Sequence, residues 1–206
     1  MNIRLTPDEK NKVMNPMEVF EIMKRILMRE SRIDRNREHF WVISLSNASK
    51  ILNIELISMG SATRTIAEPM EVFSIPLQKR AISIILVHNH PSGNVIPSSH
   101  DKDLTNLLIQ CGEIIGIRVL DHYVISPTGY YSFAETGLLE ELANSLKYVP
   151  PYKMKERHQK QLDEAIKSTE DRKARAMAKS MKEKGYKVSE IVELTGLSKY
   201  VVSRLK

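Results

Sequence analysis

The chain has 206 residues, of which 42% are hydrophobic and 27% are charged, and these fractions are ordinary for a folded globular protein. They exclude a chain that is disordered throughout its length. The net charge of +6 is unevenly distributed, because residues 151–206 hold 15 basic and 8 acidic residues whereas residues 1–150 hold 16 and 17. We therefore expect a near-neutral domain followed by a basic unit, whose natural partner is a polyanion.

The composition also limits where the protein is expected to act. The longest strongly apolar run, 81–87, has seven residues, whereas a membrane-spanning helix needs about 20. The first residues, MNIRLTPDEKNK, contain no apolar segment of signal-peptide length. The single cysteine, Cys111, cannot form an intrachain disulfide. We expect a cytoplasmic protein with no membrane partner.

In chain order, the first predicted element is a helix over 15–30, where apolar residues recur at helical spacing after a capping Asn and a Pro. Two segments rich in β-branched and aromatic residues follow at 40–46 and 51–60, and the short polar turn between them is typical of a hairpin. A helix is predicted over 68–80. It precedes the near-continuous apolar segment 81–87, which predicts a strand buried on both faces.

A loop rich in Pro, Gly, Ser and Asn then leads into a helix predicted from about Ser98, with Gly112 and Gly116 at its end. Residues 117–126 predict another strand, and 130–133 predict a short strand after a turn. Because helices are interspersed among these strands, we predict an α+β fold with α/β character, in which helices flank a mixed β-sheet.

A Pro-Pro pair at 150–151 predicts a domain boundary, because a helix does not easily continue across it. We assign residues 1–37 to an N-terminal helical segment that packs on the core and 38–146 to the main domain. Residues 147–170 are polar and charged, and we assign them to a linker that could include a solvated helix. Residues 171–206 are assigned to a small helical domain.

The last of these segments, 171–206, predicts three short helices, with Gly185 after the first and a turn at Gly196 between the other two. This pattern resembles the helix-turn-helix units of site-specific recombinases and repressors, and the resemblance implies DNA binding. The residues expected to contact DNA lie in the last helix: Lys199, Tyr200, Ser203, Arg204 and Lys206. The alternative is a helical dimerisation or docking module whose basic side chains only interact with water.

The sharpest chemical signal is His88-Asn89-His90, followed by Asp101. The two histidines leave a strand two residues apart, so both imidazoles lie on one side of it. Asp101 falls in the first turn of the next helix, where it can face the strand end. Two imidazoles and a carboxylate are preferred zinc ligands, and three protein ligands leave a fourth position for water, as in catalytic sites.

Spacing alone leaves other interpretations of this segment open. Asp101 stands three residues after Ser98, so the two could form an ordinary helix-capping pair. His100 and Asp103 are also near, and either could replace Asp101 as the third ligand.

The segment HNHPSGNVIPSSHD, with LDHYVIS and GYYSF further on, resembles the RadC family of bacterial proteins. Its His-x-His, Ser and Asp spacing resembles that of the JAMM (MPN-type) metalloproteases. The similarity extends over about 38–134 and implies an MPN/JAB fold. It also implies one zinc ion per chain, held by His88, His90 and Asp101, with Ser98 helping to stabilise an oxyanion.

The resemblance further implies a catalytic Glu at the start of an early strand. Glu38 directly precedes the strand predicted at 40–46 and is our candidate, with Glu55 in the next strand as second choice. Asp121 and His122 match an Asp-His pair of the family, and we expect them either to support a metal ligand or to be structural.

Three functional hypotheses follow. The first is a zinc-dependent hydrolase of the JAMM type, in which an activated water attacks an amide or isopeptide carbonyl of a protein or peptide, with a tail, 171–206, that binds DNA. The second is a DNA-associated protein, since RadC proteins are commonly labelled repair proteins. The third is an MPN domain that serves as a non-catalytic scaffold, although this chain retains a complete set of ligands.

Overall fold

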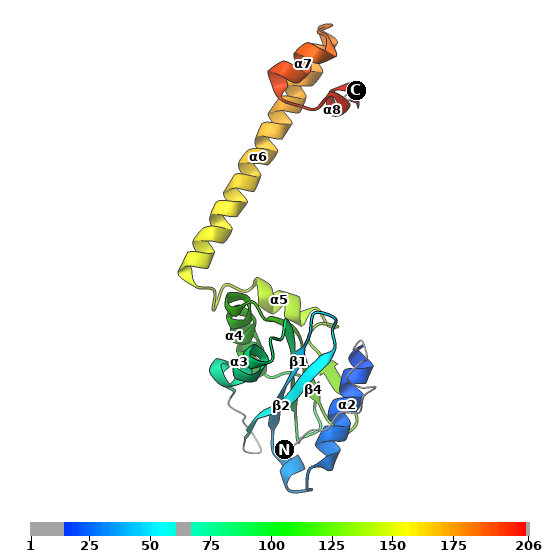
Figure 1. The fold of residues 1–206 in the computed structure, drawn as a ribbon, viewed down its shortest axis with the longest axis vertical. Coiled ribbons are helices and arrows are strands. Elements are labelled where there is room, and N and C mark those ends of the chain that lie inside the picture. Colours follow the sequence, from blue (N-terminus) through cyan, green and yellow to red (C-terminus); the bar gives the residue numbers. More distant parts are fainter. Residues whose placement is uncertain (1–14, 61–66, 205–206) are drawn as a thin grey trace. The chain divides into compact units, whose positions relative to one another are not determined.

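The computed structural model describes residues 15–60 and 67–204. The chain divides into two compact units, Met1–Tyr148 and Val149–Lys206. The first unit contains a β-sheet with flanking helices, and the described part of the second unit is helical (Figure 1).

A mixed sheet forms the centre of the first unit, with the strand order β2-β1-β3-β4-β5. Strands β3 and β4 pair in parallel, and the other neighbouring strands pair antiparallel. A parallel pair needs a crossover connection, which helix α4 (Ser99–Ile115) provides. This architecture confirms the predicted α+β fold. The strands are β1 (His39–Leu45), β2 (Ile51–Met59), β3 (Ser83–Asn89), β4 (Arg118–Ile125) and β5 (Tyr130–Ser132).

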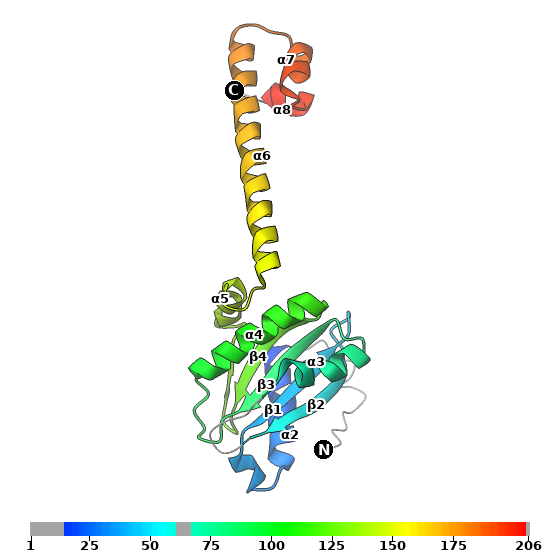
Figure 2. The ribbon, with the colours of Figure 1, turned by 90° about the vertical axis from the view of Figure 1, so that its left-hand side faces the viewer.

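Helix α2 (Pro16–Arg29) covers one face of the sheet, on the side opposite to α3 and α4 (Figure 2). Its start is fixed by a capping box, in which the Asn15 side chain accepts the Glu18 N–H and the Glu18 carboxylate accepts the Asn15 N–H. The apolar stripe of α2 packs on alternate positions of the central strands. The strand residues in this cluster include Trp41, Ile43, Leu45, Ile85 and Val87.

Helices α3 (Pro69–Gln78) and α4 cover the other face. The intervening positions of β1 and β3 form the core there, with Phe40, Val42, Ile84 and Leu86 packed against the helices. Because side chains alternate along a strand, the residue two positions after Leu86 also points to the α4 face. That residue is His88.

Strand β3 ends two residues later than its apolar run. The sequence predicts a strand over 81–87, but the ladder with β4 continues through His88 and Asn89, which pair with Val124 and Ile125. Both polar residues are buried. The last two residues of β3 are therefore polar although they are buried. An apolar run in the sequence cannot show that the strand extends this far.

Two short helices of the first unit are not predicted by the sequence pattern. They are the 3-10 helix η1 (Asp34–Asn36) and helix α5 (Leu138–Asn144). Helix α5 buries only Leu138, which packs on Phe133 and Val124. A helix of seven residues with one buried side chain gives almost no periodic signal.

The second unit begins with a single long helix, α6 (Pro151–Glu183), followed by α7 (Val188–Thr195) and α8 (Lys199–Arg204). From residue 151 the helix runs without a break through the rest of the segment assigned above to a linker that could include a solvated helix, and on past residue 171. Pro151 occupies its first turn, where a backbone N–H would have no acceptor within the helix, so the lack of an N–H in proline costs no hydrogen bond. A small core joins the three helices through Ala178, Met181, Ile191 and Val202. None of the helices in the described ranges, α6 included, is apolar enough over sufficient length to cross a bilayer.

Gly112 gives a test of packing between α4 and the start of β4. A Cβ at this position would lie 2.4 Å from the backbone oxygen of Ile117, and the Ile117 N–H already donates to Gly112. We expect Gly112→Ala to lower the free energy of unfolding by about 1–3 kcal/mol, measured by urea denaturation. Gly129→Ala, where a Cβ meets no atom within 4 Å, is the control. An unchanged midpoint for Gly112→Ala would contradict the packing described.

Candidate metal centre

The carboxyl end of β3 and the first turn of α4 bring His88, His90 and Asp101 together. His88 Nε2 lies 3.0 Å from His90 Nε2 and 3.3 Å from Asp101 Oδ1, and His90 Nε2 lies 3.5 Å from Asp101 Oδ2. Within the described ranges, these three residues form a group that could hold a metal ion. The side chains of His90 and Asp101 remain 14% and 13% exposed, so solvent or a substrate can reach the centre.

The orientation of His90 is fixed by the loop that follows it. Its Nδ1 lies 2.6 Å from the backbone oxygen of Asn94. A carbonyl oxygen can only accept, so Nδ1 carries the proton. The lone pair of Nε2 is therefore directed to the other two members of the group.

A buried hydrogen-bond chain fixes the tautomer of His88. The Thr105 hydroxyl donates to the backbone oxygen of Asp101, at 2.5 Å, so its oxygen accepts the Nδ1–H of His122, at 2.6 Å. His122 Nε2 then accepts from His88 Nδ1, at 2.8 Å. His88 is left with a free lone pair on Nε2, and the chain connects it to the main chain of Asp101. Partners of this kind orient metal ligands.

Asp101 is held by a capping box at the start of α4. Its Oδ2 accepts from the Ser98 N–H and from the Ser98 hydroxyl, both at 2.7 Å, and the Asp101 N–H donates to Ser98 Oγ at 3.2 Å. The capping alternative is thus present, and it is compatible with a ligand role, because it leaves Oδ1 facing His88. Asp103 is hydrogen-bonded instead to Lys147 and Tyr148.

The distances in this group suit a tetrahedral zinc ion. Zinc binds imidazole nitrogen and carboxylate oxygen at about 2.0–2.2 Å, which places neighbouring ligand atoms about 3.3 Å apart. The three separations in the protein are 3.0, 3.3 and 3.5 Å. In their neutral form, both imidazoles turn an unprotonated Nε2 to the group, and this is the nitrogen that a metal requires. The residues therefore fit a metal ion with one coordination position left open.

Electrostatics favour an ionised carboxylate at the centre. Burial alone would raise the pKa of Asp101, but it is outweighed by the hydrogen bonds that His88 and His90 donate when a proton, in place of a metal, occupies their Nε2 atoms. These bonds hold that pKa well below its usual range. The hydrogen bond with Asp101 raises the pKa of His90, and the charge of Glu38 adds to this shift. Complete burial lowers the pKa of His122 well below its ordinary value, so this imidazole is neutral, as an acceptor from His88 must be.

The two candidate glutamates occupy different places. Glu38 directly precedes β1, and the register Phe40↔His88 brings the start of β1 beside the end of β3. This register places Glu38 at the edge of the sheet where β3 ends, and its charge contributes to the raised pKa of His90. Glu55 lies on the outer strand β2, where it pairs with Val42 and accepts a hydrogen bond from Asn53 at 3.1 Å.

Asn89, between the two histidines, fastens the main chain on both sides of Glu38. Its side chain is buried, its Oδ1 accepts the His39 N–H at 2.8 Å, and its Nδ2 donates to the backbone oxygen of Arg37 at 3.1 Å. Sequence reasoning missed this residue. Alternation along β3 could have placed it on the face opposite the histidines, but its target depends on the pairing of β3 with β1, which no local pattern gives.

The residues expected to contact DNA lie in the second unit, on α8. Lys199, Tyr200, Ser203 and Arg204 are exposed there, and Lys206 lies outside the described residues. The Arg204 guanidinium stacks over the Tyr200 ring, 4.6 Å from its centroid. The Ser203 hydroxyl donates to the Lys199 backbone oxygen.

Comparisons with known proteins agree with this geometry. Residues 13–138 match the RadC-like JAB domain. The chain is 41% identical over 133 residues to a UPF0758 protein of Chlorobium chlorochromatii, covering 64% of this chain and 57% of the relative. It is 44% identical over 106 residues to a UPF0758 protein of Pelodictyon phaeoclathratiforme, covering 52% and 48%. The chain thus spans about half the length of the curated relatives it matches. Since the domain match covers more than half of its residues, the chain belongs to the RadC-like JAB domain family.

Proposed function

We propose that the protein is a zinc-dependent hydrolase of the JAMM type that cleaves an amide bond in a protein or peptide. The observation that carries this proposal is the triangle of His88 Nε2, His90 Nε2 and an Asp101 carboxylate oxygen, with sides of 3.0–3.5 Å. A scaffold would not need three ligand atoms at these distances in a solvent-accessible position.

The residues around the triangle supply the other parts of the chemistry. A bound zinc ion would polarise a carbonyl oxygen and lower the pKa of a coordinated water. Glu38, directly before the neighbouring strand β1, would take a proton from the attacking water and pass it to the leaving amine. Ser98 is exposed at the rim, and its hydroxyl could turn from Asp101 to a developing oxyanion. The single cysteine supports a reducing compartment such as the cytoplasm.

The direct test is metal content together with peptide hydrolysis. We expect purified full-length protein to carry about one zinc per chain by elemental analysis, and to cleave members of a mixed peptide library. A chelator should abolish cleavage, and added zinc should restore it. Stoichiometric zinc without any cleavage would favour the alternative of a non-catalytic scaffold, and absence of zinc would refute the centre.

A second activity, DNA binding by residues 171–206, is supported by the charge of the tail and by α8. The segment 151–206 has seven more basic than acidic residues. Because Val202 of α8 packs in the small core with Ala178 and Ile191, the polar side chains of α8 face solvent. We propose that the C-terminal end of α6, with α7 and α8, acts as a helix-turn-helix that localises the hydrolase on DNA.

Salt dependence tests this second proposal. We expect the affinity for a duplex to fall steeply with salt, and the double variant Lys199→Ala/Arg204→Ala to reduce the slope of log K against log salt by about two. Lys160→Ala/Lys167→Ala, which removes the same charge from the middle of α6, is the control. Fluorescence anisotropy gives the slopes. Equal slopes for the two double variants would show that α8 does not contact phosphates.

A further inference from the structure

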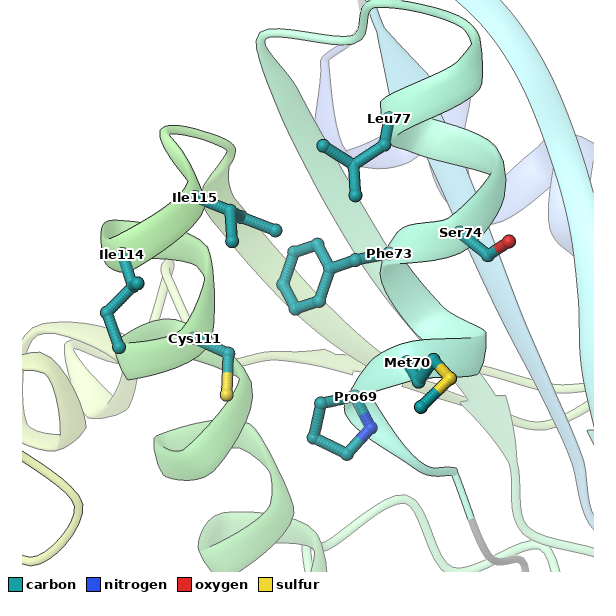
Figure 3. A pocket seen from close by; sticks show the side chains of 8 residues that line it. All are labelled: Pro69, Met70, Phe73, Ser74, Leu77, Cys111, Ile114 and Ile115. Carbon is teal, nitrogen blue, oxygen red and sulfur yellow. The ribbon is translucent and has the colours of Figure 1, made fainter.

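A groove separates α3 from α4 on the first unit. Figure 3 shows Phe73 and Leu77 of α3 facing Cys111 and the end of α4. Its volume is about 500 Å³, within the range of about 300–1,000 Å³ typical of ligand sites. Its apolar rim is unusually exposed, at 81% for Met70, 51% for Leu77 and 49% for Ile114.

The groove continues along α4 towards the first turn of that helix. A second hollow, of about 310 Å³, adjoins the first, and Pro69 lines both. On α4 this hollow is lined by His100, Asp103, Leu104 and Leu107. These positions recur at the spacing of one helix face, with three or four residues from each turn to the next, and Cys111, Ile114 and Ile115 extend that face. The groove starts at the turn of α4 that carries Asp101, the residue after His100.

The chemistry of the groove changes along its length. Towards the first turn of α4 its lining is mixed, with His100 and Asp103 among apolar residues. Asp103 accepts hydrogen bonds from Lys147 and Tyr148, and these bonds fix one wall. At the far end it is almost entirely apolar. A small apolar molecule would fill only the far end, whereas a polypeptide could occupy the whole path and deliver an amide to the centre.

We propose that this groove binds an extended segment of the polypeptide substrate, with an apolar side chain seated between α3 and α4. This inference rests on the proposed function, because the same chain must reach the metal centre. Cys111 and Ile115 lie ten and fourteen residues after Asp101, about 15–21 Å along the helix at about 1.5 Å per residue. An extended chain advances about 3.3 Å per residue. The apolar side chain should therefore lie five or six residues from the scissile bond.

The test uses peptides tipped with a hydroxamate, a zinc-chelating group, and built from Ser and Gly with one Leu at varied distance from the tip. One series carries the hydroxamate at the carboxyl end and another at the amino end. With zinc-loaded full-length protein, we expect binding in one series to be about tenfold tighter than for the Leu-free peptide when Leu lies five or six residues from the tip. The same peptides should slow alkylation of Cys111, the sole cysteine.

Two substitutions at positions of similar exposure, one in the groove and one outside it as its control, test where the Leu side chain binds. Ile114→Glu, in the groove, should abolish the gain from Leu and leave the affinity of the Leu-free hydroxamate unchanged. Ile82→Glu, which is outside the groove and similarly exposed at 44% against 49%, should preserve the gain.

The outcomes separate the two proposals. If the Leu-free hydroxamate binds but the position of Leu has no effect in either series, the groove proposal is wrong and the proposed function stands. Alkylation of Cys111 could instead slow as the protein concentration rises and not respond to added peptide. That result would show that a second copy of the chain occupies the groove, and it would overturn the proposal. If the Leu-free hydroxamate does not bind, the zinc centre fails, and the substrate groove fails with it.

Discussion

Replacing His88 with Ala, or Asp101 with Asn, is expected to lower zinc affinity more than about 100-fold, because loss of a residue that only orients a ligand already costs about 10- to 100-fold. Each replaced residue supplies one corner of a triangle with sides of 3.0–3.5 Å. With two protein ligands left, zinc should be lost during gel filtration, and hydrolysis should disappear with it. Elemental analysis and competition with a chromophoric chelator measure the loss.

The control for this prediction is Asp103→Asn. Asp103 is a carboxylate on the same helix, but it is hydrogen-bonded to Lys147 and Tyr148, so its replacement should leave zinc content unchanged. Asp101→Asn is nearly isosteric and keeps an acceptor for Ser98, so its fold should survive. If both ligand variants retain one zinc per chain, the metal lies elsewhere and the proposed mechanism is wrong.

The grouping of the three candidate ligands could be predicted because it depends on local geometry. Residues two positions apart on a strand, such as His88 and His90, point to the same side of it. Asp101 lies in the first turn of the next helix, which begins close to the end of that strand. The structure brings His88, His90 and Asp101 together as that reasoning requires. Spacing leaves the capping and ligand interpretations of Asp101 as alternatives, but its two carboxylate oxygens allow both, because Oδ2 accepts from Ser98 and Oδ1 faces His88.

From the sequence, His122 is expected to support a metal ligand or to be structural, but Thr105 and Asn89 could not be predicted, because their roles depend on tertiary pairing. Thr105 lies one turn after Asp101 and lacks any motif, and its role needs His122, which arrives from β4. Asn89 needs the antiparallel register of β1 and β3 before its amide can meet Arg37 and His39. Spacing along the chain carries no information on such contacts.

The second unit shows another limit of sequence patterns. The polar composition of 153–170 predicts either a linker or a solvated helix, and the structure shows a helix. Apolar periodicity depends on a packed face, and the buried residues of α6, Ala178 and Met181, lie close to its end. A helix without a packed face resembles a polar linker in composition.

Glu38→Gln is expected to lower kcat by about 10²–10⁴-fold, the usual contribution of general acid–base catalysis, while zinc content stays at one per chain. Glutamine keeps the size of the side chain but cannot accept the proton. Glu55→Gln, on the outer strand, should leave kcat unchanged, because Glu55 hydrogen-bonds with Asn53. Steady-state kinetics on a peptide that the wild-type protein cleaves give kcat and KM for each variant.

Asn89→Ala completes this argument, because it tests how Glu38 is positioned without altering the carboxylate. Loss of the hydrogen bonds to His39 and Arg37, at 2.8 and 3.1 Å, frees the main chain on both sides of Glu38. Since small displacements of a catalytic group are costly, kcat should fall at least about tenfold, with KM and zinc content near wild-type values. Combining Asn89→Ala with Glu38→Gln should add little to Glu38→Gln alone, because both act through one group. Losses that multiply in the double variant would show that Asn89 acts on some other part of the protein.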